Sequence, residues 1–109
     1  MLERLAMRHD DEVAILVRPT SALWRIHSLL DRVKVYREDV GDREAVARAL
    51  RDFHPDTVIH LAWTGVLNRT RNDFGQHRNV CIATQLIEAC AAAGVRAWIG
   101  LGSQAEYGP

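Results

Sequence analysis

This 109-residue sequence lacks several features, and each absence excludes a class of protein. No apolar run approaches the roughly 20 residues that a membrane-spanning helix needs. The first residues, MLERLAMRHDDE, carry too many charges for a signal peptide. The 14 basic and 14 acidic residues give a net charge of +0, so no overall field attracts nucleic acid or an anionic membrane. We therefore expect a cytoplasmic protein with no nucleic-acid or membrane partner.

Cysteines and metal-ligand patterns are also scarce. The two cysteines, Cys81 and Cys90, fall on one predicted helix, which separates them by roughly 13 Å, too far for a disulfide. Two reduced cysteines are typical of the cytoplasm. None of the five histidines pairs with a cysteine or an acidic residue at metal-ligand spacing, so the sequence predicts no metal site.

The chain does contain a regular alternation of short apolar runs with helical stretches. With 48% hydrophobic and 26% charged residues, it has the composition of one small globular domain. Strands that are apolar on both faces and separated by helices are typical of a parallel sheet with right-handed crossovers. The predicted fold class is therefore α/β. The predicted strands are Val13–Val17, Val33–Tyr36, Thr57–Trp63 and Ala97–Leu101.

Three stretches between these strands are predicted to be helical, namely Ala22–Leu30, Asp42–Phe53 and about Asp73–Ala93. Gly94 follows the last of them and is a natural C′ residue. A further apolar stripe of Leu2, Leu5 and Ala6 begins at the first residues without an N-cap. It is either a short N-terminal helix or the back end of a helix whose strand and loop are missing.

Three stretches resemble the extended short-chain dehydrogenase/reductase family of nucleotide-sugar epimerases, dehydratases and ketoreductases. They are REDVGD, DTVIHLAWTGV and NVCIATQLIEACAAAGVRAWIGLGSQAEYGP, of which the last is the most specific. The resemblance covers residues 1–109 and implies one partial Rossmann-like, doubly wound NAD(P)-binding domain with counterparts of the family's strands two to five. The central first strand, its glycine-rich loop and the substrate domain are expected to be missing. We accordingly expect the chain alone to be inactive, and to form a homo-oligomer or accept a strand from a partner.

The resemblance implies that Ser103 is the catalytic serine. It stands at the carboxyl end of a predicted strand, where doubly wound folds bind ligands, and four residues before Tyr107. A hydroxyl fixed there would stabilise the charge that develops on a sugar oxygen during hydride transfer. The alternative is a turn serine that caps the end of the strand. The family's YxxxK motif, which carries the proton-donating tyrosine, does not occur in this sequence.

The resemblance also implies cofactor contacts on the adenosine side. Asp39, with Val40, occupies the position expected to hydrogen-bond the adenine amino group; the alternative is a helix cap, a role that Asp42 serves better. NAD-selective relatives carry an acid at the end of the first predicted strand, where this chain has Val17 followed by Arg18. A cation there suits a 2′-phosphate and favours NADP over NAD, and the alternative is a solvated arginine.

Leu61, Ala62 and Trp63 match the family's backbone segment that lines the cofactor. Trp63 replaces the usual small residue, which indicates either a reshaped pocket wall or a core side chain. Asn79 matches a helix asparagine near the family's active site, and the resemblance implies that it too contacts the cofactor. The resemblance thus implies part of an NAD(P)-dependent epimerase, dehydratase or ketoreductase with a nucleotide-linked sugar as substrate. The alternatives are a non-catalytic module that senses dinucleotides or binds a protein, and a truncated product without activity.

Overall fold

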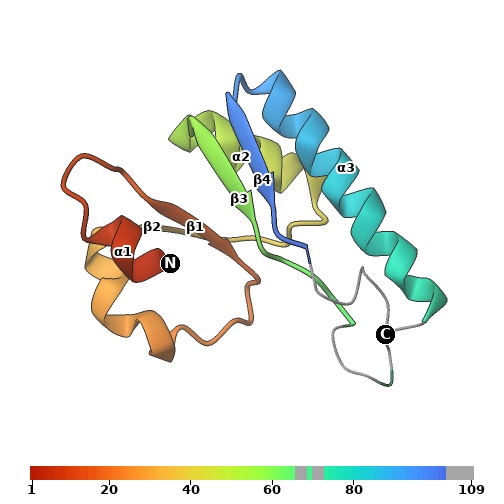
Figure 1. The fold of residues 1–109 in the computed structure, drawn as a ribbon, viewed down its shortest axis with the longest axis horizontal. Coiled ribbons are helices and arrows are strands. Elements are labelled where there is room, and N and C mark those ends of the chain that lie inside the picture. The colour runs from red at the N-terminus through yellow and green to blue at the C-terminus, as the bar shows by residue number, and fades with distance from the viewer. Residues whose placement is uncertain (66–68, 70–72, 103–109) are drawn as a thin grey trace. The chain divides into compact units, whose positions relative to one another are not determined.

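The computed structural model describes residues 1–65, 69 and 73–102, which have a mixed α/β architecture (Figure 1). The chain divides into two compact units, Met1–Ala49 and Leu50–Pro109. Each unit contains one pair of parallel strands, and the two pairs form separate two-stranded sheets. Parallel strands joined by helical connections confirm the predicted fold class, a partial Rossmann-like α/β arrangement.

The first unit pairs β1 (Ala14–Val17) with β2 (Lys34–Arg37). The strands stay in register along their whole length and end with Val17 opposite Arg37. Each strand begins one residue later than the sequence pattern predicted, and β2 also ends one residue later. Arg37 is therefore the last residue of a strand, and its side chain leaves the sheet at the carboxyl edge.

The connection between β1 and β2 is the 3₁₀-helix η1 (Trp24–Arg32), where the sequence predicted a helix over Ala22–Leu30. It contains one non-helical residue, Ile26, and no buried residue. Tryptophan, histidine, serine and aspartate make up much of this segment, and all four are mediocre α-helix formers. The apolar stripe at the N-terminus forms the short helix α1 (Leu2–Ala6), which also has no buried residue.

Helix α2 (Arg43–Phe53) begins and ends where the sequence pattern predicted, within one residue. Its N-terminus is capped by Asp42, whose Oδ1 accepts a hydrogen bond from the Ala45 backbone N–H at 3.1 Å. At the other end, His54 has a φ of 53°, a left-handed conformation that non-glycine residues adopt at a cost. The buried residues of the helix lie on one stripe and are Ala45, Val46, Ala49 and Leu50.

The second unit pairs β3 (Thr57–His60) with β4 (Ala97–Gly100), again in parallel, with His60 opposite Gly100. The sequence predicted that the first of these strands would continue to Trp63. The structure ends it at His60, because the chain leaves the sheet and turns toward the next helix. Residues 61–65 therefore lie outside the strand, and three of the predicted cofactor contacts are among them.

The connection between β3 and β4 ends in helix α3 (His77–Ala92), which follows a single 3₁₀ turn, η3 (Phe74–Gln76). The buried residues of α3 are Asn79, Leu86 and Cys90. Gly94 terminates the helix with a φ of 78°, as predicted. Its N–H donates to Ala91 O at 3.2 Å and the next N–H donates to Cys90 O at 3.0 Å, which is a Schellman motif.

Both cysteines of α3 are free. Cys81 is exposed and Cys90 is buried. Burial raises the pKa of the Cys90 thiol, because the thiolate loses its hydration there. Cys90 therefore behaves as a small apolar core residue rather than as a nucleophile.

One face of the β3–β4 pair is built around Trp98. Its indole stacks on the His60 ring, with ring centroids 5.8 Å apart and planes inclined at 28°. The same indole covers Gly100, since a Cβ on that glycine would lie 2.4 Å from the ring carbon Cη2. On the opposite face, Ile99 and Leu101 are 46% and 58% exposed. The indole thus covers the buried His60 ring, while Ile99 and Leu101 stay largely in water.

Candidate functional site

The loop that follows β1 is a β-turn fixed by an arginine of β2. The Ser21 N–H donates to Arg18 O at 2.9 Å, and Pro19 occupies the second position, where its fixed φ favours a turn. Arg37 Nη1 donates to Pro19 O at 3.3 Å and to Ser21 O at 3.0 Å. This guanidinium therefore fixes the backbone of the turn, while Arg18, the predicted phosphate contact, stays exposed.

The loop that follows β2 is organised by Asp39. Its Oδ1 accepts a hydrogen bond from the Gly41 N–H at 2.8 Å, and its carbonyl accepts one from the Asp42 N–H at 2.9 Å. An aspartate that binds its own backbone two residues on forms an Asx turn, which sets the direction of the chain into α2. Asp39 is exposed and Val40 is half-buried. Asp42, not Asp39, caps the helix, so the capping alternative for Asp39 is wrong.

These two loops lie at the same edge of the first unit. Parallel strands in register bring their carboxyl ends together, and Val17 is directly opposite Arg37. The Glu38 N–H donates to Val17 O at 2.9 Å and extends the pairing to the start of the second loop. The edge of the first sheet therefore presents Arg18 and Asp39 on neighbouring loops, the placement expected for ligand contacts in open α/β sheets.

In the second unit, the segment after β3 leaves its side chains at the surface. Leu61 is 54% exposed, Trp63 is 47% exposed, and Ala62 is exposed as well. An indole with half of its surface in water is not a core residue, so the structure rejects the core alternative for Trp63. Whether these residues touch a cofactor stays a prediction.

Asn79 holds this segment in place from α3. Its Nδ2 donates to Thr64 O at 2.9 Å and to Gln76 Oε1 at 2.8 Å. Its Oδ1 accepts from the Thr64 N–H and from the Thr64 hydroxyl, both at 3.0 Å. The side chain is only 4% exposed, and these four bonds use both of its donors and both acceptor lone pairs. Asn79 was predicted as a cofactor contact; here its amide binds the backbone that leads away from β3.

Gln76 is the residue that sequence reasoning missed. Its Oε1 accepts from the Trp63 indole Nε1 at 3.1 Å as well as from Asn79, and its Nε2 donates to Gly65 O at 2.9 Å. A glutamine in the turn before a helix carries no recognisable pattern. Only the path of the chain after β3 brings it against Trp63 and Gly65.

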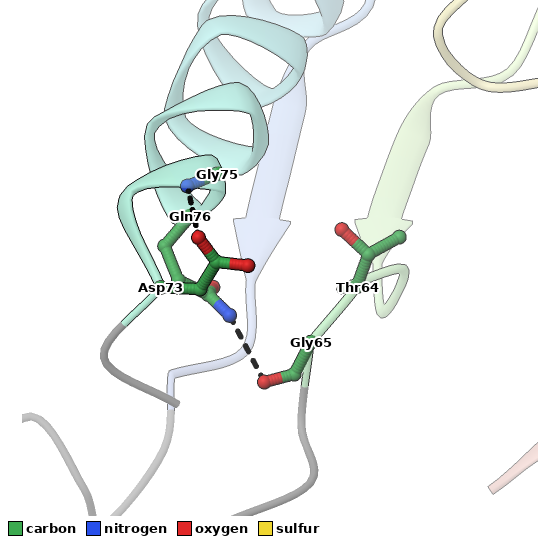
Figure 2. A pocket seen from close by; sticks show the side chains of 5 residues that line it. All are labelled: Thr64, Gly65, Asp73, Gly75 and Gln76. Atoms are coloured by element: carbon green, nitrogen blue, oxygen red, sulfur yellow. Dashed lines mark hydrogen bonds between the residues drawn. The ribbon is translucent and has the colours of Figure 1, made fainter. Parts of the chain in front are cut away.

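A cavity of about 220 Å³ lies beside this cluster. Figure 2 shows the Gln76 amide reaching across it to Gly65, and the Asp73 carboxylate turned back onto the start of η3. The Asp73 Oδ1 accepts from the Gly75 N–H at 3.1 Å and caps this turn. The residues that line the cavity are Thr64, Gly65, Asp73, Gly75 and Gln76.

His60 is the last residue of β3 and is 8% exposed. Burial lowers the pKa of its imidazole, because the charged form loses hydration. Burial therefore favours the uncharged imidazole, which stacks on the Trp98 indole. Within residues 1–65, 69 and 73–102, no group of three or more histidine, cysteine or acidic side chains could hold a metal ion.

The predicted catalytic serine, Ser103, lies outside the described residues, as does Tyr107. Across the part of the chain that is described, every helix is too short or too polar to cross a membrane. The described residues contain two strand-end clusters, one in each unit.

The arrangement of these clusters defines a class of protein, the α/β proteins that place ligand contacts at the carboxyl ends of parallel strands. Comparison with known families gives the particular family. The family model described as the NAD dependent epimerase/dehydratase family matches residues 1–109. The chain belongs to this family, which confirms the resemblance drawn from its three sequence stretches. Its family is thus one whose members depend on a nicotinamide dinucleotide.

Proposed function

We propose that this chain provides the adenosine-binding part of an NADP-dependent enzyme that acts on a nucleotide-linked sugar, by reduction or epimerisation. The observation that carries the proposal is the hydrogen-bonded β-turn from Arg18 to Ser21, which follows β1. Arg37 holds the backbone of this turn through two carbonyl oxygens, and the Arg18 side chain is left exposed beside the carboxyl end of the strand.

The chemistry of this edge suits the adenosine end of a phosphorylated dinucleotide. The guanidinium of Arg18 can form a charge-assisted bidentate pair with a 2′-phosphate, and the hydroxyls of Thr20 and Ser21 lie in the same turn. Val17 stands where an acidic residue would bind the ribose hydroxyls in NAD-selective relatives. The Asp39 carboxylate, oriented by its bond to the Gly41 N–H, is an acceptor suited to the adenine amino group.

The second unit contributes the wall after β3. Leu61, Ala62 and Trp63 are exposed in a segment that is held in place by hydrogen bonds with Asn79 and Gln76. A bound nicotinamide dinucleotide supplies or accepts the hydride in this family. The hydroxyl of Ser103 is proposed to donate a hydrogen bond to the sugar oxygen on which negative charge develops.

The test uses a ligand pair that differs only in the group Arg18 is proposed to bind. Adenosine 2′,5′-bisphosphate and AMP share the adenosine and the 5′-phosphate, and neither depends on a glycine-rich loop for a nicotinamide half. We expect the 109-residue chain to bind the bisphosphate more tightly. Arg18→Ala should remove that preference, at a loss of about 1–3 kcal/mol for a charge-assisted pair.

Arg48→Ala is the matched control, since Arg48 is an exposed arginine on α2 and the change removes the same charge. It should leave the preference for the bisphosphate intact. Equal affinities of the unmodified chain for the two ligands, measured by titration calorimetry, would count against NADP. Absence of binding to either ligand would count against the adenosine site itself.

A further inference from the structure

We propose that Gln76 is a positioning residue that locks the segment Trp63–Gly65 into one geometry before any ligand binds. The assignment rests on the proposed function only in that this segment contacts the dinucleotide. The lock itself is a property of the free chain. It joins Gln76, the last residue of η3, to Trp63 and Gly65, the residues on either side of Thr64.

The geometry of the carboxamide carries the proposal. Gln76 Oε1 accepts two hydrogen bonds, from the Trp63 indole at 3.1 Å and from Asn79 Nδ2 at 2.8 Å. Its Nε2 donates to Gly65 O at 2.9 Å. One planar group therefore binds a side chain and a backbone carbonyl two residues apart, while Asn79 binds both backbone groups of Thr64 between them.

This arrangement determines what Trp63 offers to a ligand. An exposed indole has one polar group, the Nε1–H, and a large apolar ring. Here the Nε1–H is already bonded to Gln76, so the half of the side chain that remains in water has only ring surface to present. Trp63 is therefore oriented as a flat apolar wall at the carboxyl end of β3, and it has no free donor for a ligand hydrogen bond.

Gly65 is the second element that the lock fixes. It has a φ of 76°, a conformation that glycine adopts freely and that alternates easily with others. The bond from Gln76 Nε2 to Gly65 O, drawn in Figure 2, holds the backbone of Gly65 at its carbonyl and favours this one conformation. A segment held in this way loses less conformational freedom when a ligand binds than a free loop would, which favours binding.

The experiment measures solvent exchange of the indole protons by NMR in the free 109-residue chain. Its three tryptophans give internal references, since Trp24 is 72% exposed and the Trp98 Nε1–H is buried. In Gln76→Met, which keeps the length of the side chain without its polar atoms, the Trp63 indole proton should exchange roughly three- to tenfold faster. Trp63→Phe assigns the resonance by removing it.

Two further variants test whether faster exchange of the Trp63 indole comes from the lost Gln76 hydrogen bonds or from a general loosening of the chain. Gln85→Met makes the same chemical change later in α3, at a glutamine with no side-chain hydrogen bond to the described residues, and should leave Trp63 exchange unchanged. Gln76→Glu keeps the acceptor oxygens and loses the donor to Gly65, so it should restore slow Trp63 exchange. Unchanged Trp63 exchange in Gln76→Met would overturn the proposal.

A second readout tests whether the lock serves binding. We expect Gln76→Met to weaken NADPH binding roughly three- to tenfold, the loss expected from one or two hydrogen bonds that pre-organise the site. Equal NADPH affinities of Gln76→Met and the unmodified chain would overturn the positioning role. If the unmodified chain binds no NADPH, the exchange rates still decide whether the lock exists, and the adenosine 2′,5′-bisphosphate titration decides the proposed function separately.

Discussion

The two strand pairs of this protein differ in the kind of side chain that holds the loop after their first strand. In each unit, one side chain from a later element holds the loop that leaves the first strand. In the first unit this is Arg37, an exposed cation that donates to two carbonyl oxygens. In the second unit it is Asn79, which is 4% exposed and bonded at all four polar positions, with Gln76 beside it.

The connections between the strands also differ, both in the regularity of their helices and in the side chains that they bury. η1 is a kinked 3₁₀-helix without a buried residue, whereas α3 is a regular helix of 16 residues that buries three side chains and ends in a Schellman motif. A buried amide that is fully satisfied is costly to open, because each freed group must remain without a partner or admit water. We infer that residues 63–65 are held more firmly than the turn of residues 18–21.

The largest expected effect concerns Asn79. Replacing it with leucine keeps the volume and removes four hydrogen bonds, which leaves the Thr64 N–H and carbonyl without their partner. We expect a loss of about 2–3 kcal/mol in the free energy that protects the Thr64 amide from hydrogen exchange. If Asn79→Leu leaves Thr64 protection unchanged, the second loop is not held by this residue and the comparison fails.

Arg37 gives the corresponding measurement in the first unit. Arg37→Met removes the donors to Pro19 O and Ser21 O and keeps the aliphatic stem. Because water can replace the arginine at this exposed position, we expect a loss of only about 0.5–1 kcal/mol in protection of the Ser21 amide. An effect as large as that of Asn79→Leu would show that an exposed cation can fix a loop as firmly as a buried amide.

The ends of α2 and α3 allow a test of similar size that depends on the backbone alone. An added Cβ at Gly94 meets no atom within 4 Å, so Gly94→Ala should cost about 1 kcal/mol through its φ of 78° alone. His54 has a φ of 53°, so His54→Gly should stabilise the chain by roughly 0.5 kcal/mol. The free energy of unfolding in urea measures both effects. Changes of the same sign in the two variants would contradict the assignment of backbone strain to His54 and of its absence to Gly94.

His60 adds a pH dependence that belongs to the second unit. Burial lowers its pKa in the folded chain below the ordinary value of 6.5, so as the pH falls the unfolded chain takes up the proton first. The stabilising contribution is complete above pH 6.5 and is lost as the pH drops toward the lowered pKa. The urea midpoint should fall less between pH 7.5 and 5 in His60→Phe than in the unmodified chain; parallel curves would contradict this.

The sequence predicted elements well where one local signal decides the conformation. The β-branched run before Arg18 became β1, Asp42 capped α2, and Gly94 ended α3. Prediction was weaker where several poor helix formers compete, as in η1, and where a strand ends without a breaker, as in β3. No signal in the sequence indicated that His60 would be the last paired residue.

The site was predicted only in part, for a physical reason. Arg18 and Asp39 stand next to strand ends, so their place at the sheet edge follows from the strand assignment. Gln76 acts on Trp63 and Gly65 across a loop, and such a contact depends on the path of the backbone rather than on a local pattern. The resemblance pointed to Asn79, while its bonds to Thr64 emerged only from the three-dimensional structure.

The Trp98 ring above Gly100 restricts the order in which this protein can change. Any side chain at position 100 would collide with the indole, since even a Cβ would lie 2.4 Å from it. A smaller residue at position 98 removes that obstacle and also uncovers His60, which the indole stacks against. Substitutions at these positions are therefore strongly non-additive. A side chain at position 100 therefore requires that the indole at position 98 moves off His60 or is replaced, so divergence at one of these positions changes what the other can accept.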